Sequence, residues 1–325
     1  MIVERILAPV VHELAQVEER LFQEIGGRVE LIAEITRYVL KSGGKRIRPA
    51  LLLLSAKLCG YRIGSRNIAL AVVAEYMHAA TLIHDDIIDN ADKRRGLPSA
   101  NRTWGPQVSV LAGDFLYARS LQILVADGDL NVMQAFADAT VQMTEGEVRE
   151  VQRAGDLDLT YDEYLEIIIS KTAALMSAAC RAGALIAAAS AEAVAALTEF
   201  GLNLGVGFQL VDDALDFVAK EDRLGKPVGN DFKEGKVTFP VLHVLRAGSE
   251  ADRKRLRELV AKESIGEADL TEVKEMVERH RAVAATMEQV RTYLEQAKAP
   301  LAIFPDSAAK RSLVSMVDFV RDRDW

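Results

Sequence analysis

The chain has 325 residues, a formal net charge of −8 and a sequence pI near 5.4. An acidic balance of this size argues against nonspecific nucleic-acid binding, which needs a basic surface. Half of the residues are hydrophobic, which is enough for a substantial core, and only 6% are aromatic. Abundant Ala and Leu with only 8 Pro favour helix over sheet.

The chain has two cysteines, Cys59 and Cys180, too few for a disulfide framework. We therefore expect buried thiols in a reducing compartment. The N-terminal stretch meets charge within its first four residues and has no apolar core of a signal peptide. No uncharged apolar run reaches the roughly 18 residues of a membrane span. These features predict a cytoplasmic protein without a transmembrane segment.

Helical periodicity dominates the chain from end to end. It predicts helices over residues 3–24, 28–41, 47–59, 65–90, 99–126, 130–150, 160–189, 192–219, 236–247, 251–262, 268–297 and 307–322. No alternation of period two bounded by turns appears, so we expect essentially no sheet. No linker or composition shift divides the sequence. The prediction is a single all-α, bundle-like domain over residues 1–325.

Two acidic clusters share the spacing D-D-x-x-D. The first, in "LIHDDIID", contains Asp85, Asp86 and Asp89, and the second, in "QLVDDALDF", contains Asp212, Asp213 and Asp216. On a helix, positions i and i+4 lie on one face about 6 Å apart. The first and last aspartates of each cluster should therefore lie side by side. We expect the aliphatic spacers between them to be buried.

Carboxylates placed together at the ends of apolar helices repel each other, and burial raises that cost unless cations neutralise them. Sites rich in oxygen and free of Cys suit a hard divalent ion such as Mg²⁺. Because Mg²⁺ is usually held by one or two carboxylates plus substrate phosphates, the clusters predict a diphosphate ligand. A single such cluster could be a solvated acidic helix end. A second copy with matching spacers makes that alternative weak.

Groups of cations adjoin glycine turns near both clusters. Guanidinium groups bind phosphate bidentately, and glycine lets the backbone approach an anion closely. The cations fall in three segments and are Lys45, Arg46 and Arg48; Lys93, Arg94 and Arg95; and Lys226 and Lys236. Each group alone could be ordinary surface charge. Together they predict two phosphate sites, one metal-bridged between the aspartate clusters and one metal-free, lined by Lys45, Arg48 and Arg95.

A family resemblance rests on motifs that cover residues 43 to 240 nearly continuously. They are "GGKRIRPALLLL", "LIHDDIIDNADKRRG", "GDFLYARSLQIL", "SKTAALMSAAC", "GFQLVDDALDF" and "GKPVGNDFKEGKVTFP". In this order they resemble the motifs of the trans-prenyl diphosphate synthases. The C-terminal "FPDSAAKRSLVSMVDFVRDRDW" is similar to the long-chain members, especially the octaprenyl diphosphate synthases.

The resemblance implies an all-α fold around a deep central cavity, usually in a homodimer. It implies Mg²⁺-dependent condensation of isopentenyl diphosphate with an allylic diphosphate such as farnesyl diphosphate, with three Mg²⁺ ions bound. A long polyprenyl product of this kind would serve as a ubiquinone or menaquinone side chain.

The resemblance also implies residue roles, position by position. The metal ligands would be Asp85, Asp89 and Asp212, with Asp86, Asp213 and Asp216 as further ligands or acting through bound water. The isopentenyl diphosphate site would contain Lys45, Arg48, His78 and Arg95. The allylic diphosphate, or the cation formed from it, would face Arg94, Lys171, Thr172, Gln209, Lys226 and Lys236.

The residues before Asp85 bear on product length. One helical turn rises about 5.4 Å, close to our rough length of one isoprene unit, so a bulky side chain a turn before Asp85 would limit the product. The residues there are small, which predicts a long product; the candidate chain-length residues are Met77, Ala79, Ala80 and Thr81. Alternatively, Ala79 and Ala80 only allow close packing against a neighbouring helix.

Other functions fit the sequence less well. A shorter-chain farnesyl or geranylgeranyl diphosphate synthase differs only in product length. A terpene cyclase needs no second diphosphate site, which Lys45, Arg48 and Arg95 predict here. A non-catalytic regulatory subunit usually loses an aspartate cluster, and both are complete. A generic acidic helical scaffold explains neither the repeated cluster nor the grouped cations.

Overall fold

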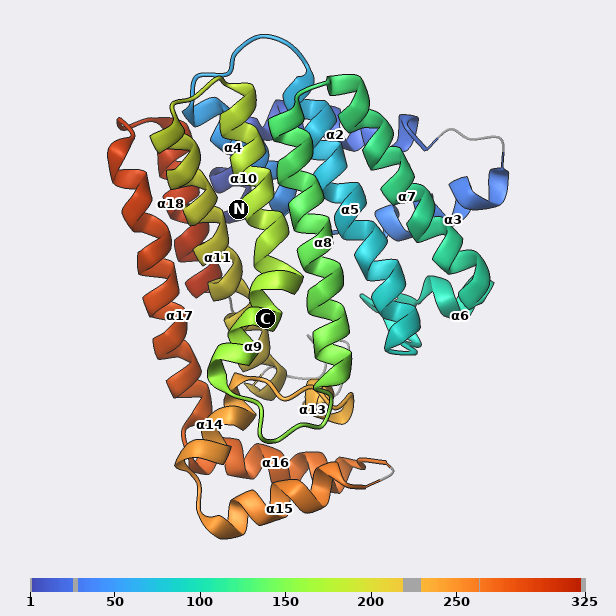
Figure 1. Ribbon diagram of the computed structural model, residues 1–325, viewed down its shortest axis with the longest axis vertical. Helices are drawn as coiled ribbons and strands as arrows, with labels where there is room; N and C mark the ends of the chain where they lie inside the picture. Colours follow the sequence, from blue (N-terminus) through green and yellow to red (C-terminus); the bar gives the residue numbers. More distant parts are fainter. Residues whose placement is uncertain (1, 26–28, 219–228, 263, 323–325) are drawn as a thin grey trace. The chain divides into compact units, whose positions relative to one another are not determined.

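The computed structural model describes residues 2–25, 29–218, 229–262 and 264–322, and these are helical almost throughout (Figure 1). The helices up to the first acidic cluster are α1 (Ile2–Leu7), the 3₁₀ helix η1 (Ala8–Val10), α2 (Val11–Gln23), α3 (Glu30–Lys41), α4 (Ile47–Leu58) and α5 (Arg66–Ile88). Two short strands follow, β1 (Lys93–Arg94) and β2 (Leu97–Pro98).

Beyond the strands the chain returns to helix. The next elements are α6 (Ala100–Trp104), α7 (Pro106–Asp127), α8 (Leu130–Gln152), α9 (Tyr161–Ile168), the π-helix η2 (Ile169–Ala173), α10 (Ala174–Ile186) and α11 (Ala191–Val218). The last are α13 (Asn230–Lys233), α14 (Phe239–Ala247), α15 (Glu250–Val260), α16 (Glu267–Arg279), α17 (Ala282–Lys298), η3 (Ala299–Ile303) and α18 (Ala308–Arg321).

The chain forms two compact units. The first comprises residues 1–140, 175–201 and 300–316, and the second comprises residues 141–174, 202–299 and 317–325. The prediction of a single domain over residues 1–325 stays a prediction. The first aspartate cluster belongs to the first unit and the second cluster to the second.

Helix α5 is the central helix of the first unit. It packs against α2, α3, α4, α6 and α7, and most of its side chains are buried. A helix that is apolar nearly all round must be covered by others, which is what its sequence predicts. Its last turn carries the first aspartate cluster, so the acidic residues lie at the end of the most enclosed element of the unit.

In the second unit, α14 packs against α9, α15, α16 and α17. Helices α15 and α16 lie beside each other at the bottom of Figure 1. Asp252, in the first turn of α15, caps its own helix with Ser249 and also accepts hydrogen bonds from Arg279 and His280. These contacts hold the end of α16 to the start of α15.

The structure confirms the prediction of an all-α chain and divides several predicted helices. The predicted helix 3–24 is interrupted by the 3₁₀ helix Ala8–Val10, which contains Pro9. The segment 99–126 breaks at Gly105, which has a φ of +83° and precedes Pro106. The segment 160–189 contains a π-helix, and 268–297 breaks at Arg281, which has φ of +52°. Among the described residues the only β-ladder pairs Lys93 with Pro98 and Arg94 with Leu97.

Helices α7 and α11 are long and apolar enough to cross a membrane by length and composition. The buried helices of soluble proteins meet the same criterion. The buried share of the most apolar 18-residue window is 56% in α11 but only 39% in α7.

Candidate active site

The first aspartate cluster ends α5. Asp89 is the C-cap residue, and its backbone N–H donates to the Asp85 carbonyl at 2.8 Å. Asp86 is only 4% exposed and accepts a hydrogen bond from Arg94 Nε at 2.7 Å. The expectation that the aliphatic spacers are buried is wrong for Ile88, which is 51% exposed. Because the arginine neutralises Asp86, the buried position is taken by the acid rather than by the aliphatic residue.

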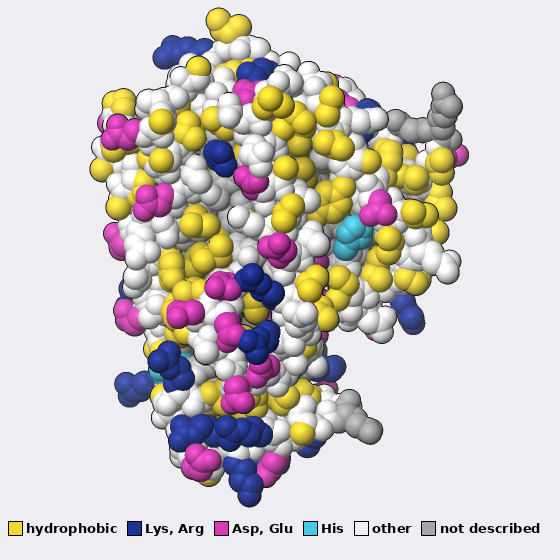
Figure 2. Space-filling model, in the orientation of Figure 1, with side chains coloured by type: hydrophobic (Ala, Val, Ile, Leu, Met, Phe, Trp, Pro, Cys, Tyr) yellow, Lys and Arg dark blue, Asp and Glu magenta, His cyan; other side chains and the backbone are white. Residues whose placement is uncertain are grey.

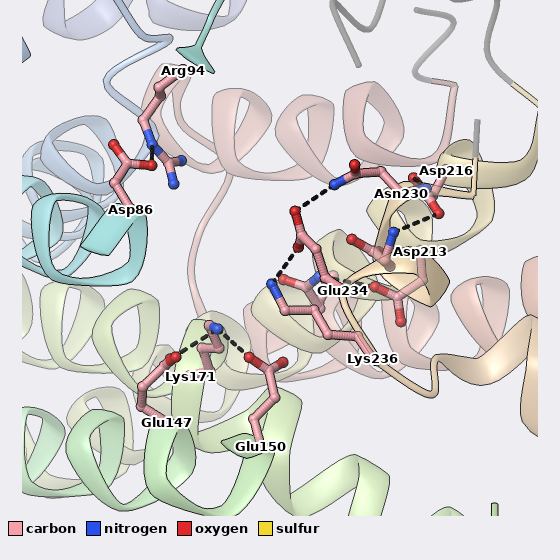
Figure 3. Close-up of polar contacts among 12 residues, drawn as sticks. Asp86, Arg94, Glu147, Glu150, Lys171, Asp213, Asp216, Asn230, Glu234 and Lys236 are labelled. Carbon is pink, nitrogen blue, oxygen red and sulfur yellow. Dashed lines mark hydrogen bonds and ion pairs between the residues drawn. The ribbon is translucent and has the colours of Figure 1, made fainter. Parts of the chain in front are cut away.

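The β1–β2 hairpin holds two cations next to this cluster. Arg94 lies in β1 and reaches Asp86, as Figure 3 shows. Arg95 and Gly96 form the turn, with φ of +52° and +79°. Two consecutive positive φ values are typical of the tight hairpin turns that match strand twist. The hairpin is therefore the local structure that places Arg94 against the acidic helix end.

The glycine loop before α4 approaches the same turn. A Cβ atom built on Gly44 would lie 3.1 Å from Arg95 Nη1, so a larger residue here would press against this guanidinium. Lys45 follows and is exposed, and Arg48, in the first turn of α4, is half-buried. The structure thus brings the Gly44–Lys45 loop to Arg95, and the metal-free phosphate site at this place stays a prediction.

His78 lies among the arginines of this group. Burial, and then the charges of Arg48, Arg95, Arg94 and Arg46, hold the pKa of His78 well below its usual range. The imidazole is consequently neutral at physiological pH, and a neutral ring can donate one hydrogen bond and accept another. Burial also lowers the pKa of Arg95, although nearby Glu75 opposes this effect. We call Lys45, Arg48, His78 and Arg95 the basic group.

The second aspartate cluster lies in α11, and neutral donors bind its inner members. Asp213 is nearly inaccessible; it accepts a short hydrogen bond from Tyr164 Oη and one of 2.9 Å from Gln209 Nε2. Asp216 accepts the backbone N–H groups of Asn230 at 3.2 Å and Asp231 at 3.3 Å, which begin α13. Asp212 is half-buried.

These carboxylates are difficult to ionise together. Burial, and then the charge of Asp231, raise the pKa of Asp213 to about 7. The same two causes raise the pKa of Asp216 to about 8. Burial and the nearby Asp213 raise the pKa of Tyr164 well above its usual range, so this hydroxyl stays protonated and donates. When ionised, the cluster carries more negative charge than its neighbours compensate, and a bound cation would relieve that repulsion.

Lys171 is presented by the π-helix η2. Its Nζ donates to Glu147 at 2.8 Å and, more closely, to Glu150, both on α8 (Figure 3). Helix α8 can approach this closely because residue 146 is glycine: a Cβ atom there would lie 2.6 Å from the Ser170 Cβ. π-Helical turns occur frequently at functional sites, and here the turn sets the direction of Lys171.

A cavity of about 150 Å³ in the second unit joins these residues. Thr172 Oγ1 donates to Gln209 Oε1 at 2.7 Å, and Gln209 Nε2 donates in turn to Asp213. Thr172 and Asp213, the first and last residues of this series of hydrogen bonds, both line the cavity. Its lining consists of Glu150, Arg153, Leu159, Tyr164, Ile167, Ile168, Lys171, Thr172, Gln209, Asp213, Asp231, Gly235, Lys236, Val237 and Thr238.

Two further predicted cations belong to this part of the chain. Lys236 lines the cavity and donates to Glu234 at 2.8 Å. Figure 3 shows this pair, and Glu234 also accepts from Asn230 at 2.6 Å. Lys226 lies outside the described residues, so its role stays a prediction.

Sequence reasoning missed several residues of the cavity. Tyr164 bonds to Asp213 from 49 positions away along the chain, and no local pattern indicates that pairing. Glu147 and Glu150 precede Lys171 by more than twenty positions, and only the neighbouring Gly146 marks a close helix contact. Each of these residues acts through a tertiary contact.

The candidate chain-length residues fall into two groups. Ala79 and Ala80 are buried, Ala80 completely, which fits the alternative that they allow close helix packing. Thr81 is half-buried and is the residue one turn before Asp85. Met77 is buried, and Thr140 Oγ1 of α8 lies 3.7 Å from its sulfur.

The donor sets fit a hard divalent ion. Within the described ranges, no group of three or more His, Cys, Asp and Glu side chains could hold a metal ion. Mg²⁺ often needs only one or two carboxylates, because phosphate oxygens and water complete its octahedron. All the acidic ligands present are oxygen donors, and at Asp213 and Asp216 a cation would relieve the repulsion that raises both pKa values.

An all-α fold with aspartate clusters, a cavity lined by Lys171 and a separate basic group defines a class of enzymes that act on diphosphates. The chain matches the polyprenyl synthetase family over residues 29–278. It belongs to that family. The enzymes of this family are prenyltransferases, and the chain is a member of the trans-prenyl diphosphate synthases.

Individual relatives differ in product. The chain is 34% identical to octaprenyl diphosphate synthase of Escherichia coli, over 100% of both chains. It is 36% identical to a short chain isoprenyl diphosphate synthase of Methanothermobacter thermautotrophicus, over 94% of this chain and 95% of that one. A polyprenyl synthase of Caulobacter crescentus, solved with calcium and isoprenyl diphosphate, is 35% identical with a TM-score of 0.95, covering 99% and 98%. Overall identity therefore does not decide product length.

The raised pKa values predict how the stability of the Mg²⁺-free protein depends on pH. Asp213 and Asp216 titrate near 7 and 8 when folded but near 3.8 when unfolded, so the folded state binds more protons between these values. Stability should therefore fall as pH rises from about 4 to 8, by up to several kcal/mol. We expect the thermal midpoint of unfolding to fall between pH 5 and pH 8, and Asp213→Asn to flatten that slope.

Asp269→Asn is the matched control. Its hydrogen bond with Lys262 lowers the pKa of Asp269, so it stays ionised throughout this pH range, and its partner is a lysine rather than a histidine. The variant should lower the midpoint equally at pH 5 and pH 8. Equal slopes for Asp213→Asn and the wild type would contradict the assignment.

Proposed function

We propose that the chain is a long-chain trans-polyprenyl diphosphate synthase, which adds isopentenyl diphosphate units in sequence to an allylic diphosphate primer and makes an octaprenyl-type product. The proposed condensing activity rests on one observation: two chemically different groups that suit a diphosphate occur in one chain. Carboxylate clusters suit a metal-bound diphosphate, whereas the basic group around His78 suits a diphosphate without metal. A condensing enzyme needs both.

The proposed Mg²⁺ ligands are Asp85 and Asp89 in one cluster and Asp212 in the other, with three ions bound in the working enzyme. The calcium and isoprenyl diphosphate in the Caulobacter structure support a divalent ion in this family. When bound, the ions supply the positive charge that stabilises the departing diphosphate. Asp86 is buried against Arg94, so its proposed role is to fix that arginine rather than to bind metal directly.

The proposed allylic diphosphate site uses Lys171, Arg94, Lys226 and Lys236 as cations. Arg94 gives its Nε–H to Asp86, and a guanidinium has four further N–H groups for phosphate. Lys171 must exchange part of its contact with Glu147 and Glu150 for phosphate oxygens. The isopentenyl diphosphate then occupies the basic group.

Departure of the allylic diphosphate leaves a carbocation, which the double bond of isopentenyl diphosphate attacks. The Thr172 hydroxyl, the Gln209 carbonyl and the Lys171 backbone carbonyl are proposed to stabilise it through their dipoles. Hydrogen bonds from Thr172 to Gln209, and from Gln209 to Asp213, already fix the first two of these groups. The departed diphosphate accepts the proton lost in the final step.

We also propose a cytoplasmic enzyme that prefers farnesyl diphosphate and supplies ubiquinone or menaquinone side chains. A shorter-chain synthase would share every diphosphate contact and differ only along α5. A terpene cyclase would not use the basic group, and a regulatory subunit would not use both aspartate clusters.

Incubation with farnesyl diphosphate, labelled isopentenyl diphosphate and Mg²⁺ tests this function. The wild type should form a long polyprenyl diphosphate, sized after extraction and dephosphorylation. Asp85→Asn and Asp212→Asn should each lower kcat by ~100-fold or more, because one magnesium ligand is lost while the fold is kept. Asp129→Asn serves as control, since this acid binds Arg66 and the first backbone N–H groups of α8, and should leave kcat near the wild-type value. Prenyl transfer at the wild-type rate by Asp85→Asn would exclude the metal assignment.

Product length is tested by a pair of adjacent substitutions. Thr81→Phe places a ring one turn before Asp85, at a position that is only half-buried. It should shorten the main product to roughly farnesyl or geranylgeranyl length. Ala80→Phe puts the same ring where no space is accessible, so it should lower the thermal midpoint instead. Chain lengths are compared by thin-layer chromatography. An unchanged product from a folded Thr81→Phe enzyme would show that the limit lies elsewhere.

We propose that the enzyme is a homodimer assembled through α7. This helix is apolar along its length, yet Val110, Leu111, Leu121 and Val125 are all exposed. Figure 2 shows hydrophobic side chains gathered over α7 on the visible face. A contiguous exposed apolar surface of this kind is typical of a protein–protein interface.

Charge placed on this helix should therefore separate the subunits. Leu111→Glu combined with Leu121→Glu should shift the sedimentation coefficient from that of a dimer to that of a monomer. Ile63→Glu is the matched control, because Ile63 is more exposed than either leucine but lies in the loop before α5. A dimer that survives the double substitution would place the interface on another surface.

A further inference from the structure

Arg46 lies within the "GGKRIR" motif, but its guanidinium is bound by acids of the protein itself. Its Nε makes a short hydrogen bond to Glu18 Oε1, and its Nη2 reaches Glu18 Oε2 at 3.3 Å. Its Nη1 donates to Glu75 Oε1 at 2.5 Å, and Nη2 donates to the Leu40 carbonyl at 2.9 Å. Four contacts use most of the five donors of the group.

These contacts join four helices of the first unit. Glu18 lies on α2, Leu40 in the last turn of α3, Arg46 at the N-cap of α4 and Glu75 on α5. We call Arg46, Glu18 and Glu75 the clamp. The segment between α3 and α4, which carries Gly44 and Lys45, is held at its α4 end by the clamp.

The backbone of Arg46 is in the left-handed region, with φ of +49° and ψ of +40°. A residue with a Cβ atom adopts this conformation at an energetic cost, and it persists when surrounding contacts over-determine it. The clamp supplies those contacts. Since Lys45 precedes Arg46 and Arg48 follows two positions later, the φ and ψ of Arg46 set the direction of both side chains.

Glu75 also acts on the other half of the basic group. It is 6% exposed, lies one turn from His78 on α5, and its charge opposes the lowering of the Arg95 pKa. Without this carboxylate, Arg46 would keep only Glu18 as a counter-ion among the described residues and would lie near the charge of Arg95. Like charges in such a place repel, and the loop would move to separate them.

We propose that Arg46 and Glu75 are positioning residues of the metal-free diphosphate site: the clamp fixes Lys45 and Arg48 on one side and Arg95 on the other at the spacing that isopentenyl diphosphate requires. This assignment rests on the proposed function. Arg46 itself holds the loop rather than the substrate. Loss of the clamp should weaken binding of isopentenyl diphosphate and leave the allylic substrate unaffected.

Steady-state kinetics on the full-length enzyme separate these effects. Glu75→Gln keeps the shape of the side chain but removes its charge, and should raise KM for isopentenyl diphosphate about tenfold, because a buried charge pair is broken. KM for farnesyl diphosphate and kcat should each stay within about threefold. Arg46→Lys keeps the charge without the forked geometry, and should give a smaller rise than Arg46→Met.

Asp127→Asn provides the matched control. Asp127 binds Arg66 through two hydrogen bonds of 2.7 and 2.8 Å, at the other end of the same helix α5. This variant should lower the thermal midpoint without changing either KM. Glu18→Gln is a second clamp variant that leaves Glu75 in place, and it tests the clamp if Glu75→Gln does not fold. Because Glu18 is the more exposed acid, its expected rise in KM is smaller.

The outcomes distinguish the two proposals. A wild type without condensing activity overturns the proposed function. An active wild type with unchanged KM values in the folded clamp variants overturns the clamp. Equal rises in both KM values would also overturn it, because they indicate a general structural effect. A selective rise for isopentenyl diphosphate, absent in Asp127→Asn, supports it.

Discussion

Two buried carboxylates on α5 determine the geometry of the basic group. Glu75 and Asp86 lie about three helical turns apart on one face, and each is less than a tenth exposed. Burying a carboxylate costs several kcal/mol unless a cation and hydrogen bonds compensate it. Arg46 and Arg94 provide that compensation from the loop before α4 and from the hairpin after α5. Both segments that carry phosphate-binding cations are thereby tied to one rigid helix.

The second aspartate cluster solves the same problem in another way. Tyr164, Gln209 and the backbone of α13 donate hydrogen bonds to Asp213 and Asp216, but none of these donors carries a charge. Neutral donors orient a carboxylate without cancelling its charge, which is why both pKa values remain raised. A cluster compensated in this way keeps its affinity for an external cation. Asp86, already paired with Arg94, has far less to gain from one.

The sequence predicts what depends on local pattern and misses what depends on distant contacts. Helical periodicity and turn residues placed most helices, and the repeated spacing identified both aspartate clusters. The roles of Asp86 and Arg46 were not apparent, since both look like members of a charged motif until their partners are known. Glu75 and Tyr164 gave no signal, because a single polar residue in an apolar helix has no periodicity. Nor does any local pattern predict the π-helix at Lys171, where Gly146 of α8 lies against Ser170.

The same helix α5 that carries the acids also bears on product length. Its one aromatic residue, Tyr76, is nine positions before Asp85 and therefore lies on the opposite face, at about 100° per residue. Its hydroxyl donates to the Leu21 carbonyl of α2 at 2.6 Å, deep in the core. Rotating the ring toward the Asp85 side would leave that buried carbonyl without its donor, at a cost of about 1–3 kcal/mol. The ring is thus held away from the Asp85 side, on which Ala74, Met77, His78 and Thr81 lie instead.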